Sequence, residues 1–480
     1  MQVKTNYESK RVFDYFWEIC SIPHGSGDMD RISRYCVEFA QKNKLRYLVD
    51  DAKNVVIFKP ASKGFERAEP IILQGHLDMV CQKTANSDFD FLNDSLKTYI
   101  EGDFIKADAT TLGADNGIAV AMIFAILEND SISHPEIQAV LTTDEEIGML
   151  GAAVLDMSCL NAKRMINLDS EEDGIVTVSC AGGADFKITL PINKCSANGT
   201  KISIVLSSLL GGHSGIDINK NRYNANLLSG RLLYKLGRKF DFSIISINGG
   251  DKTNAIANCC EITLCTQVGD EFAKFANYCL NELSQEIKSA EPSFEFEVEI
   301  CNSGEFEVLD NKSAQNLIFA LSCVPNGIVN MSADIENLVE TSLNLGILKT
   351  NQSNITMKFA LRSNKITALN ALIERLECFS KQITAEYETD GMYPPWEYRK
   401  NSRLREIYFE AYQDLFGETP KAEAIHAGLE CAVFASKIKD IDCIAIGPSL
   451  FDVHTVNERA SISSIDRTYG LLLEILKKIK

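Results

Sequence analysis

The stretch GIAVAMIFAILE, residues 117–128, is almost wholly apolar and predicts a helix. Short apolar runs lie on both sides of it and predict strands at residues 55–58, 70–74, 137–143 and 163–168. Strands that alternate with helices are typical of a doubly wound α/β sheet. We therefore expect the first part of the chain to form such a sheet.

A different pattern begins near residues 180–183. Alternation of apolar and polar residues predicts strands at 201–206 (KISIVL) and 293–299 (SFEFEVE), and amphipathic helices are predicted at 224–239, 271–288 and 367–383. After YPPW at 393–396, a helix (402–415), an apolar run (441–446) and a last helix (465–478) look like more of the first sheet. We expect a first domain formed by residues 1–184 and 389–480. An α+β domain at 185–388, built from two similar βαβ halves, interrupts it.

Composition narrows the class of protein. The chain of 480 residues is too long for one core, and its 24% charged residues are ordinary for a soluble globular protein. A net charge of −18 argues against nucleic acid and anionic membranes as partners, because both are polyanions. No signal peptide or membrane span is expected, and 15 scattered cysteines without a CxxC pair indicate reduced thiols. We expect a cytoplasmic location.

Histidines and acids gather just after the predicted strands. His76-Leu77-Asp78 follows PIILQ, and Asp78 could orient a metal-binding imidazole, although an isolated pair of this kind is more often a surface pair. Asp115, in GADNG, opens the apolar helix, where a helix N-cap is an equal alternative.

Three more motifs share this placement. The acids 144–146 in TTDEEIG and Asp169 in NLD end apolar strands, and Asp452-Val453-His454 lies beyond the run 441–446. Taken alone, the three adjacent acids could form a solvated loop. Ligands of open α/β sheets bind at the carboxyl ends of the strands, so the coincidence indicates one site.

The donors of this site suit divalent metals. An imidazole from each end of the chain and three carboxylates form a mixed nitrogen and oxygen set, which fits zinc, manganese or cobalt. Two divalent cations would be balanced by three carboxylates and a bridging hydroxide, whereas one cation would leave surplus negative charge. The sequence therefore predicts a pair of ions.

As a set, the motifs resemble the co-catalytic zinc metallopeptidase family that includes carnosinase, aminoacylase and carboxypeptidase G. Within that family the chain is most similar to the aminoacyl-histidine (Xaa-His) dipeptidases, or peptidase D type, over essentially its whole length. The motifs that carry the resemblance are SIPHGSG (21–27), QGHLDMV (74–80), TLGADNGIAVA (111–121), TTDEEIGMLGA (142–152), NLDSEE (167–172), GGHSGIDI (211–218) and HAGLEC (426–431).

The resemblance implies a role for each residue of the metal site. His76 and Asp169 would bind one metal, and Glu146 and His454 the other. Asp115 would bridge both metals, beside a cis peptide bond to Asn116. Asp78 would orient His76, and Glu145 would be the general base. Two divalent ions, zinc or alternatively manganese or cobalt, are the implied cofactors.

The resemblance also makes the inserted domain a lid that forms a homodimer. His213 would polarise the substrate carbonyl, and Asn254 and Arg362 would grip a substrate carboxylate, although such residues are often merely exposed or in surface ion pairs. His426 and Gly428 match the loop that binds the substrate in relatives. That loop reads Glu-Gly-Gly in relatives and His-Ala-Gly here, so recognition of the substrate's amino end stays open.

The implied activity is hydrolysis of dipeptides, of the Xaa-His type and more broadly. The substrate would be a small peptide, attacked by a metal-bridging hydroxide. A tripeptidase or an N-acyl-amino-acid deacylase of the same family is the alternative. A non-catalytic peptide-binding protein is a further one, and it would have lost Glu145 or a ligand, whereas this chain retains them all.

Overall fold

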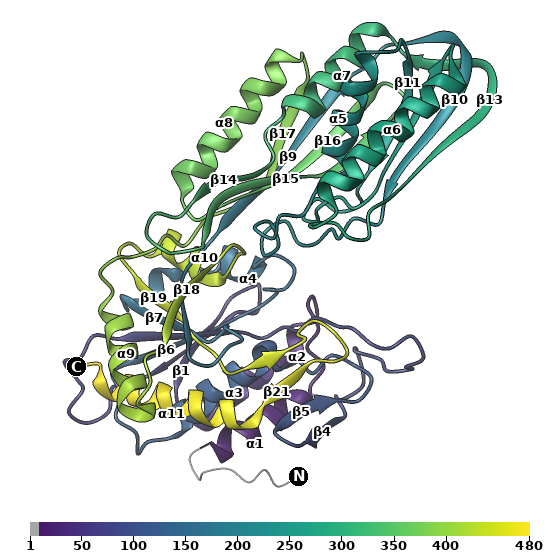
Figure 1. Cartoon of the computed structure of the whole chain (residues 1–480). Coiled ribbons are helices and arrows are strands. Elements are labelled where there is room, and N and C mark those ends of the chain that lie inside the picture. Colours follow the sequence, from purple (N-terminus) through teal and green to yellow (C-terminus); the bar gives the residue numbers. More distant parts are fainter. Residues whose placement is uncertain (1–8) are drawn as a thin grey trace. The chain divides into compact units, whose positions relative to one another are not determined.

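Three β-sheets form the framework of residues 9–480, the part that the computed structural model describes. The chain divides into two units (Figure 1). The first unit holds the described residues up to Cys180, together with Trp396–Ala424 and Leu429–Lys480, and the inserted unit holds Ala181–Pro395 and Ile425–Gly428. The division falls at 181 and 395, where the sequence suggested 185 and 388. Residues 1–8 lie outside the described residues. They include the start of the predicted first domain and part of the segment that was expected to contain no signal peptide.

A mixed eight-stranded sheet carries the first unit. In sheet order its strands are β1 (Arg46–Val49), β2 (Val55–Lys59), β6 (Ile137–Thr142), β3 (Ile71–His76), β7 (Arg164–Asn167), β19 (Asp442–Ala445), β8 (Ile175–Cys180) and β18 (Lys421–Ile425). The four central strands β6, β3, β7 and β19 run parallel, and antiparallel strands flank them. Their carboxyl ends therefore meet at one edge.

Helices pack on this sheet. They are α1 (Lys10–Cys20), α2 (Asp30–Lys42), α3 (Ala114–Glu128), α4 (Leu150–Val154), α9 (Arg403–Phe416), α10 (Glu430–Lys437) and α11 (Ile462–Lys478), with a short 3-10 turn at Met157–Cys159. Figure 1 places α4 and α10 on the face opposite α1, α3 and α11, as expected for a doubly wound α/β sheet. Thirteen of the 15 residues of α3 are buried, which explains its apolar sequence.

A small antiparallel sheet completes the first unit. Its strands, in order, are β20 (Leu450–Phe451), β21 (Arg459–Ser461), β5 (Phe104–Ala107) and β4 (Thr98–Glu101). It joins a segment that precedes α3 to the segment that precedes α11. Parts of the chain more than 300 residues apart in sequence thus meet next to the start of α3.

The inserted unit is one antiparallel sheet covered on one face by four helices (Figure 1). The strands are β9 (Gly182–Pro191), β10 (Lys194–Ser207), β11 (Ser243–Gly249), β12 (Cys260–Thr266), β13 (Glu295–Leu309), β14 (Gly327–Met331), β15 (Val339–Thr350), β16 (Asn354–Ser363) and β17 (Glu386–Tyr393), and the helices are α5 (Ala225–Gly237), α6 (Gly269–Ile287), α7 (Asn311–Cys323) and α8 (Ile366–Gln382). One core of buried aliphatic and aromatic side chains lies between the helices and the sheet.

Two similar halves build this sheet. The first half runs β10-α5-β11-β12-α6-β13, and its strands lie in the order β13-β10-β12-β11. The second runs β9, then α7, β15, β16, α8 and β17, and lies in the order β17-β9-β16-β15. Both are βαββαβ motifs in which the first and third strands lie in the middle. Each half therefore contains two βαβ units joined by a hairpin, where the sequence suggested a single βαβ unit, and the halves join through β11 and β15.

Two expectations from composition can be compared with the described residues. All 15 cysteines lie between Cys20 and Cys443, and each is a free thiol. In residues 9–480, no helix combines the length and the apolar character needed to cross a bilayer.

Candidate metal centre and substrate site

The carboxyl edge of the parallel strands gathers the predicted ligands. His76 ends β3, Glu146 follows β6 and Asp169 follows β7. His454 departs from the sequence interpretation, because it follows β20 of the small sheet and not the apolar run directly. Its φ of +64° is in the left-handed region, so the loop holds His454 in a backbone conformation that is uncommon for residues other than glycine.

Asp115 lies between His76 and His454. Its Oδ1 is 3.1 Å from His76 Nε2, and its Oδ2 is 3.1 Å from His454 Nε2. His76 Nε2 is in turn 3.4 Å from Asp169 Oδ1, and His454 Nε2 is 2.9 Å from Glu146 Oε1. Two ligands of one tetrahedral zinc ion are about 3.3 Å apart. Each oxygen of Asp115 therefore belongs to a separate set of donors with the spacing of a metal site.

The alternative role of Asp115 as a helix cap is not supported. Within residues 9–480 the Asp115 carboxylate accepts no hydrogen bond from a backbone N–H group, and both of its oxygens face imidazoles instead. His76, Asp115 and Glu146 form the group of potential metal ligands found in the described part of the chain. The peptide bond between Asp115 and Asn116 is cis, as the resemblance implied.

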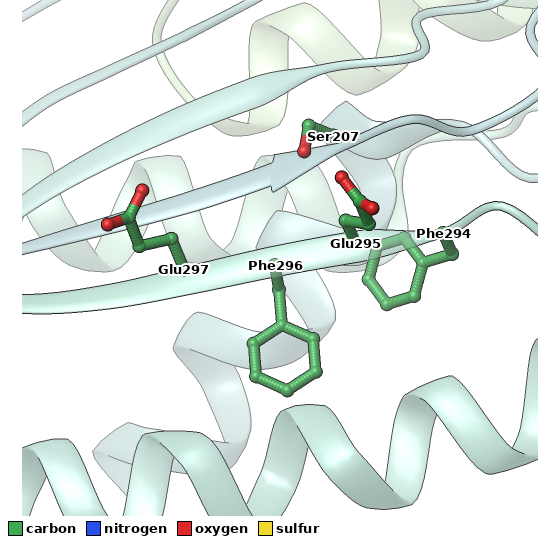
Figure 2. A pocket seen from close by; sticks show the side chains of 5 residues that line it. All are labelled: Ser207, Phe294, Glu295, Phe296 and Glu297. Carbon is green, nitrogen blue, oxygen red and sulfur yellow. The ribbon is translucent and has the colours of Figure 1, made fainter.

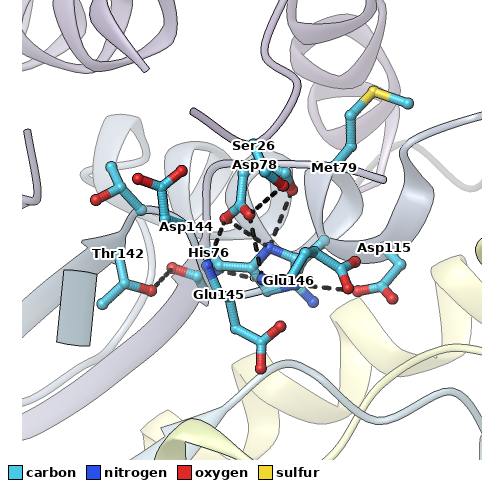
Figure 3. A network of polar contacts seen from close by, with 12 residues as sticks. Ser26, His76, Asp78, Met79, Asp115, Thr142, Asp144, Glu145 and Glu146 are labelled. Atoms are coloured by element: carbon cyan, nitrogen blue, oxygen red, sulfur yellow. Dashed lines mark hydrogen bonds and ion pairs between the residues drawn. The ribbon is translucent and has the colours of Figure 1, made fainter. Parts of the chain in front are cut away.

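The carboxylate of Asp78 organises the loop after β6 (Figure 3). It accepts hydrogen bonds from the backbone N–H groups of Glu145 (3.0 Å) and Glu146 (3.2 Å) and from the Ser26 hydroxyl (2.8 Å). One of its oxygens is 3.4 Å from His76 Nδ1. The backbone carbonyl oxygen of Asp78 is closer, at 3.0 Å from the same Nδ1. Asp78 thus holds both the His76 imidazole and the loop that carries the two glutamates.

The surroundings of Glu145 favour the protonated form of its carboxyl group. Its side chain is partly exposed and extends away from Asp78 in Figure 3, whereas Glu146 faces His454. Burial raises the pKa of Glu145 well above its ordinary value, and the nearby carboxylates of Asp169 and Glu430 raise it further. A carboxylate with a raised pKa accepts and returns protons near neutral pH.

The grouped carboxylates of this site favour the binding of cations. Asp78, Asp115, Glu146 and Asp169 form ion pairs only with the two histidines in residues 9–480, and no Lys or Arg is among their partners. Burial raises the pKa of Asp169 to about 8, and the Asp115 carboxylate adds to this effect. Such carboxylates are ionised together at neutral pH only when positive charge lies among them. The donor set therefore fits two divalent ions.

Four residues that the sequence did not single out contact the predicted ligands or the strands and loops that carry them. The Asn116 side-chain amide accepts a hydrogen bond from the His76 backbone N–H (3.2 Å) and donates one to Asp169 Oδ1 (2.8 Å). It therefore links His76 and Asp169, the two residues predicted to bind the same metal ion. Glu430, fully buried, accepts from the Thr142 hydroxyl at 2.6 Å, and burial raises its pKa to about 7. Ser26 and Glu458 are the other two. All four lie in or beside the quoted motifs, but only contacts in the folded chain distinguish them.

A second cluster lies within the inserted unit and contains His213 and Arg362. His213 Nδ1 accepts hydrogen bonds from the backbone N–H groups of Gly215 and Ile216, both at 3.2 Å, so the ring proton is on Nε2. Arg362 Nη2 lies 3.3 Å from that Nε2, which brings two donors together. Arg362 also donates to Tyr393 Oη (3.1 Å), while its buried Nε has no hydrogen-bond partner in residues 9–480. An oxygen atom of a ligand would satisfy these donors.

The other residues predicted to bind substrate differ in exposure and in whether their polar groups already have hydrogen-bond partners. Asn254 is exposed, and its side-chain amide makes no hydrogen bond within residues 9–480. His426 is buried, and its ring nitrogens lie 2.7 Å from Ser342 Oγ and 3.3 Å from Asn364 Oδ1. Burial, with the Arg362 charge, lowers the pKa of His426 to about 3, so the ring is neutral. Gly428 belongs to the same returning segment of the inserted unit.

A shallow pocket elsewhere in the inserted unit contains none of the predicted residues. It is lined by Ser207, Phe294, Glu295, Phe296 and Glu297, where β10 pairs with β13. Figure 2 shows the two phenylalanines on one side of β13 and the two glutamates on the other. This alternation is that of any half-buried strand, and we assign the pocket no role.

An α/β sheet whose carboxyl edge gathers two histidines and several buried carboxylates defines a metal-dependent hydrolase. The chain matches the model of peptidase family M20/M25/M40 over residues 72–478, and it belongs to that family. The family resemblance proposed from the motifs is thereby confirmed.

Two relatives match along nearly the whole chain. The cytosol non-specific dipeptidase of Escherichia coli (strain K12) is 34% identical over 472 residues, which cover 98% of this chain and 97% of that protein. The crystal structure of an aminoacylhistidine dipeptidase from Vibrio alginolyticus superposes with a TM-score of 0.92 at 33% identity, covering 99% of this chain and 98% of that one. An aminopeptidase from Bacillus cereus, with a TM-score of 0.57, 16% identity and 99% of both chains covered, shares the fold.

Proposed function

We propose that this peptidase is a two-metal dipeptidase. The observation that carries the proposal is the position of Asp115, whose two oxygens each lie 3.1 Å from a different histidine, with a further acid beside each histidine. His76 and Asp169 would hold one ion, Glu146 and His454 the other, and Asp115 would bridge them. Zinc suits this mixture of imidazole and carboxylate, and manganese or cobalt are alternatives.

The substrate class follows from the relatives. The matched proteins of Escherichia coli and Vibrio alginolyticus are named a non-specific and an aminoacylhistidine dipeptidase, and both are covered almost completely. We infer that dipeptides are the substrates here, including those that end in histidine. A tripeptidase or a deacylase would use the same metal site and differ at the ends of the substrate.

Hydrolysis of the peptide bond would use both the bound ions and side chains of the protein. Bound ions would lower the pKa of a water molecule and polarise the peptide carbonyl. Glu145 accepts a proton from the attacking water and passes it to the leaving amine, as its raised pKa permits. Asp78 keeps Glu145 in place through the backbone N–H bond of 3.0 Å.

The cluster around Arg362 would bind the substrate's carboxylate. Arg362 offers an unpartnered Nε, and no carboxylate within residues 9–480 forms an ion pair with it. The exposed amide of Asn254 would add a donor, and His213 Nε2–H would donate to the carbonyl oxygen. His426 would act on the substrate indirectly, because both of its ring nitrogens already contact Ser342 and Asn364. Gly428 has no side chain, so it would contribute only its backbone groups to substrate binding.

A hydrolysis panel tests this proposal. Metal-free protein is assayed with an Xaa-His dipeptide, other dipeptides, a tripeptide and an N-acyl amino acid, each with added zinc, manganese or cobalt. We expect metal-dependent release of amino acids from dipeptides and little from the other substrates. Preferred hydrolysis of the tripeptide or of the N-acyl amino acid would replace the dipeptidase proposal with the corresponding alternative.

We further propose a cytoplasmic homodimer in which His213 serves the site of the partner subunit. The GGHSG motif and the resemblance of the inserted unit to a dimerisation domain support this proposal. Inactive Glu145→Gln and His213→Ala chains are mixed under conditions where subunit exchange is verified. Partial return of activity is expected, because one site of each heterodimer would have both groups, and no return would mean that His213 acts in its own chain or not at all.

A further inference from the structure

Helix α3 meets a buried charge at each end. Its middle is apolar and surrounded by core, so it offers few polar contacts that could fix its position. Glu458 lies at its start and is 3% exposed, and Lys59 lies at its end and is 4% exposed. The backbone of Asp115 and Asn116 is not helical, so Glu458 lies beside the turn that precedes the continuous part of α3. Lys59 lies at the carboxyl end, where a positive charge interacts favourably with the helix dipole.

Glu458 binds four consecutive backbone N–H groups. Its Oε2 accepts from Leu112 (2.7 Å) and Gly113 (3.1 Å), and its Oε1 accepts from Ala114 (2.8 Å) and Asp115 (3.4 Å). Both carboxylate oxygens are thus used on the backbone that carries the central metal ligand. Glu458 is also only four residues from His454, so one short loop supplies a ligand and this contact.

Lys59 makes the equivalent contact at the other end of the helix. Its ammonium donates to the carbonyl groups of Ile126 (3.2 Å), Leu127 (3.1 Å) and Asn129 (2.7 Å). The two ends of a 15-residue helix are about 20 Å apart. Lys59 therefore satisfies the last carbonyl groups of α3 but is remote from the ligand end.

We propose that Glu458 is a positioning residue that orients Asp115 between the two histidines. The inference rests on the proposed two-metal function. Because its carboxylate fixes four successive amides, it limits rotation of the backbone at the start of α3, where the Asp115 side chain begins. Each oxygen of Asp115 is then aimed at a different histidine. Without Glu458 the same loop could turn, and one oxygen of Asp115 would leave its histidine.

A purely structural role is the competing interpretation, since the first N–H groups of any helix need acceptors. Stability alone cannot separate the two interpretations, because removal of either buried charge destabilises the helix. The affinity for metal can separate them. Lys59→Met serves as the matched control, because it removes a buried charge from the same helix at the end remote from Asp115.

The test uses the full chain, stripped of metal and titrated with zinc against a chelating dye. Thermal unfolding of the metal-free variants is measured in parallel. We expect wild type to bind two zinc ions and Glu458→Gln to bind them about 10- to 100-fold more weakly, the usual effect of losing a partner of a ligand. Glu458→Asp, which keeps the charge on a shorter side chain, should lie between them. Lys59→Met should lower the unfolding temperature and leave zinc affinity unchanged.

The outcomes separate the two proposals. Failure of the wild type to bind two zinc ions would contradict the proposed function itself. If the wild type binds two ions and the Glu458 variants bind them equally well while unfolding earlier, only the positioning role is wrong. If Glu458→Gln does not fold, Glu458→Asp carries the test, and zinc affinity equal to that of Lys59→Met would overturn the inference.

Discussion

The two units contain polar clusters of opposite character. Around Asp115 the first unit gathers carboxylates, and only histidines pair with them within residues 9–480. Around Arg362 the inserted unit gathers donors. They include a buried Nε without a hydrogen-bond partner in the described part of the chain, and two donor nitrogens 3.3 Å apart. Within residues 9–480, the first cluster has no Lys or Arg among its ion-pair partners, and in the second cluster Arg362 Nε has no acceptor.

The difference shows what each cluster requires. Carboxylates held together at a sheet edge are stable only with cations, whereas converging N–H donors are stable with an oxygen anion. The two clusters therefore have opposite charge requirements, and each can be altered separately.

Removal of the central carboxylate should have the largest effect. Asp115→Ala takes a ligand from both ions, so we expect zinc affinity and activity to fall more than about 100-fold, beyond the loss of an outer partner. Elemental analysis of purified protein measures the metal. Asp310→Ala, which removes the helix cap of α7 in the inserted unit, is the control and should cost about 1 kcal/mol of stability with no loss of metal. Full occupancy of both ions in Asp115→Ala would contradict the bridging assignment.

The adjacent glutamates should separate catalysis from metal binding. Glu145→Gln removes the proton acceptor but keeps the shape, so we expect turnover to fall at least about 100-fold while both metals stay bound. Glu146→Gln should instead lose metal, because its Oε1 lies 2.9 Å from His454 Nε2. Steady-state kinetics with parallel metal analysis distinguishes these results. A Glu145→Gln enzyme with near wild-type turnover would remove Glu145 as the base.

Substitution in the second cluster should change binding more than turnover. In Arg362→Met the substrate carboxylate loses charged hydrogen bonds, so we expect KM for a dipeptide to rise about 10- to 100-fold. The same dipeptide with a C-terminal amide is the control substrate, because it has no carboxylate for Arg362 to bind. An equal change in KM for both substrates would show that Arg362 does not recognise the carboxylate.

The smallest expected effect is on the pH dependence of stability. The pKa of His426 is about 3 when folded and near 6.5 when unfolded. Between these values the unfolded chain binds the extra proton, so stability falls as pH falls from 6.5 toward 3, by up to about 1.4 kcal/mol per pH unit. Urea unfolding of metal-free protein at pH 7 and pH 5 should show a smaller difference for His426→Asn. Equal differences would mean that His426 is protonated in the folded chain.

Local patterns were sufficient to predict the most apolar elements of the first unit, but not its short and exposed strands. The apolar run 117–128 forms most of α3, and the predicted strand 137–143 matches β6 within a residue. Such runs are decisive because a buried segment has few alternatives to a regular hydrogen-bonded element. The two halves of the inserted unit were only partly foreseen, since a paired hairpin inside each half depends on contacts between strands far apart in sequence.

For the site, the sequence by itself determined which residue types were present and that they followed strands. Chemistry limits metal ligands to a few side chains, so His76, Asp115 and His454 stand out in a list of motifs. The tertiary structure alone decided which atoms meet. In the folded chain the two oxygens of Asp115 face different histidines, and the Asp78 carboxylate accepts a hydrogen bond from the backbone N–H of Glu145. Glu458 likewise binds the backbone at the start of α3. Contacts across more than 300 residues leave no local pattern, because only the closed fold brings those groups together.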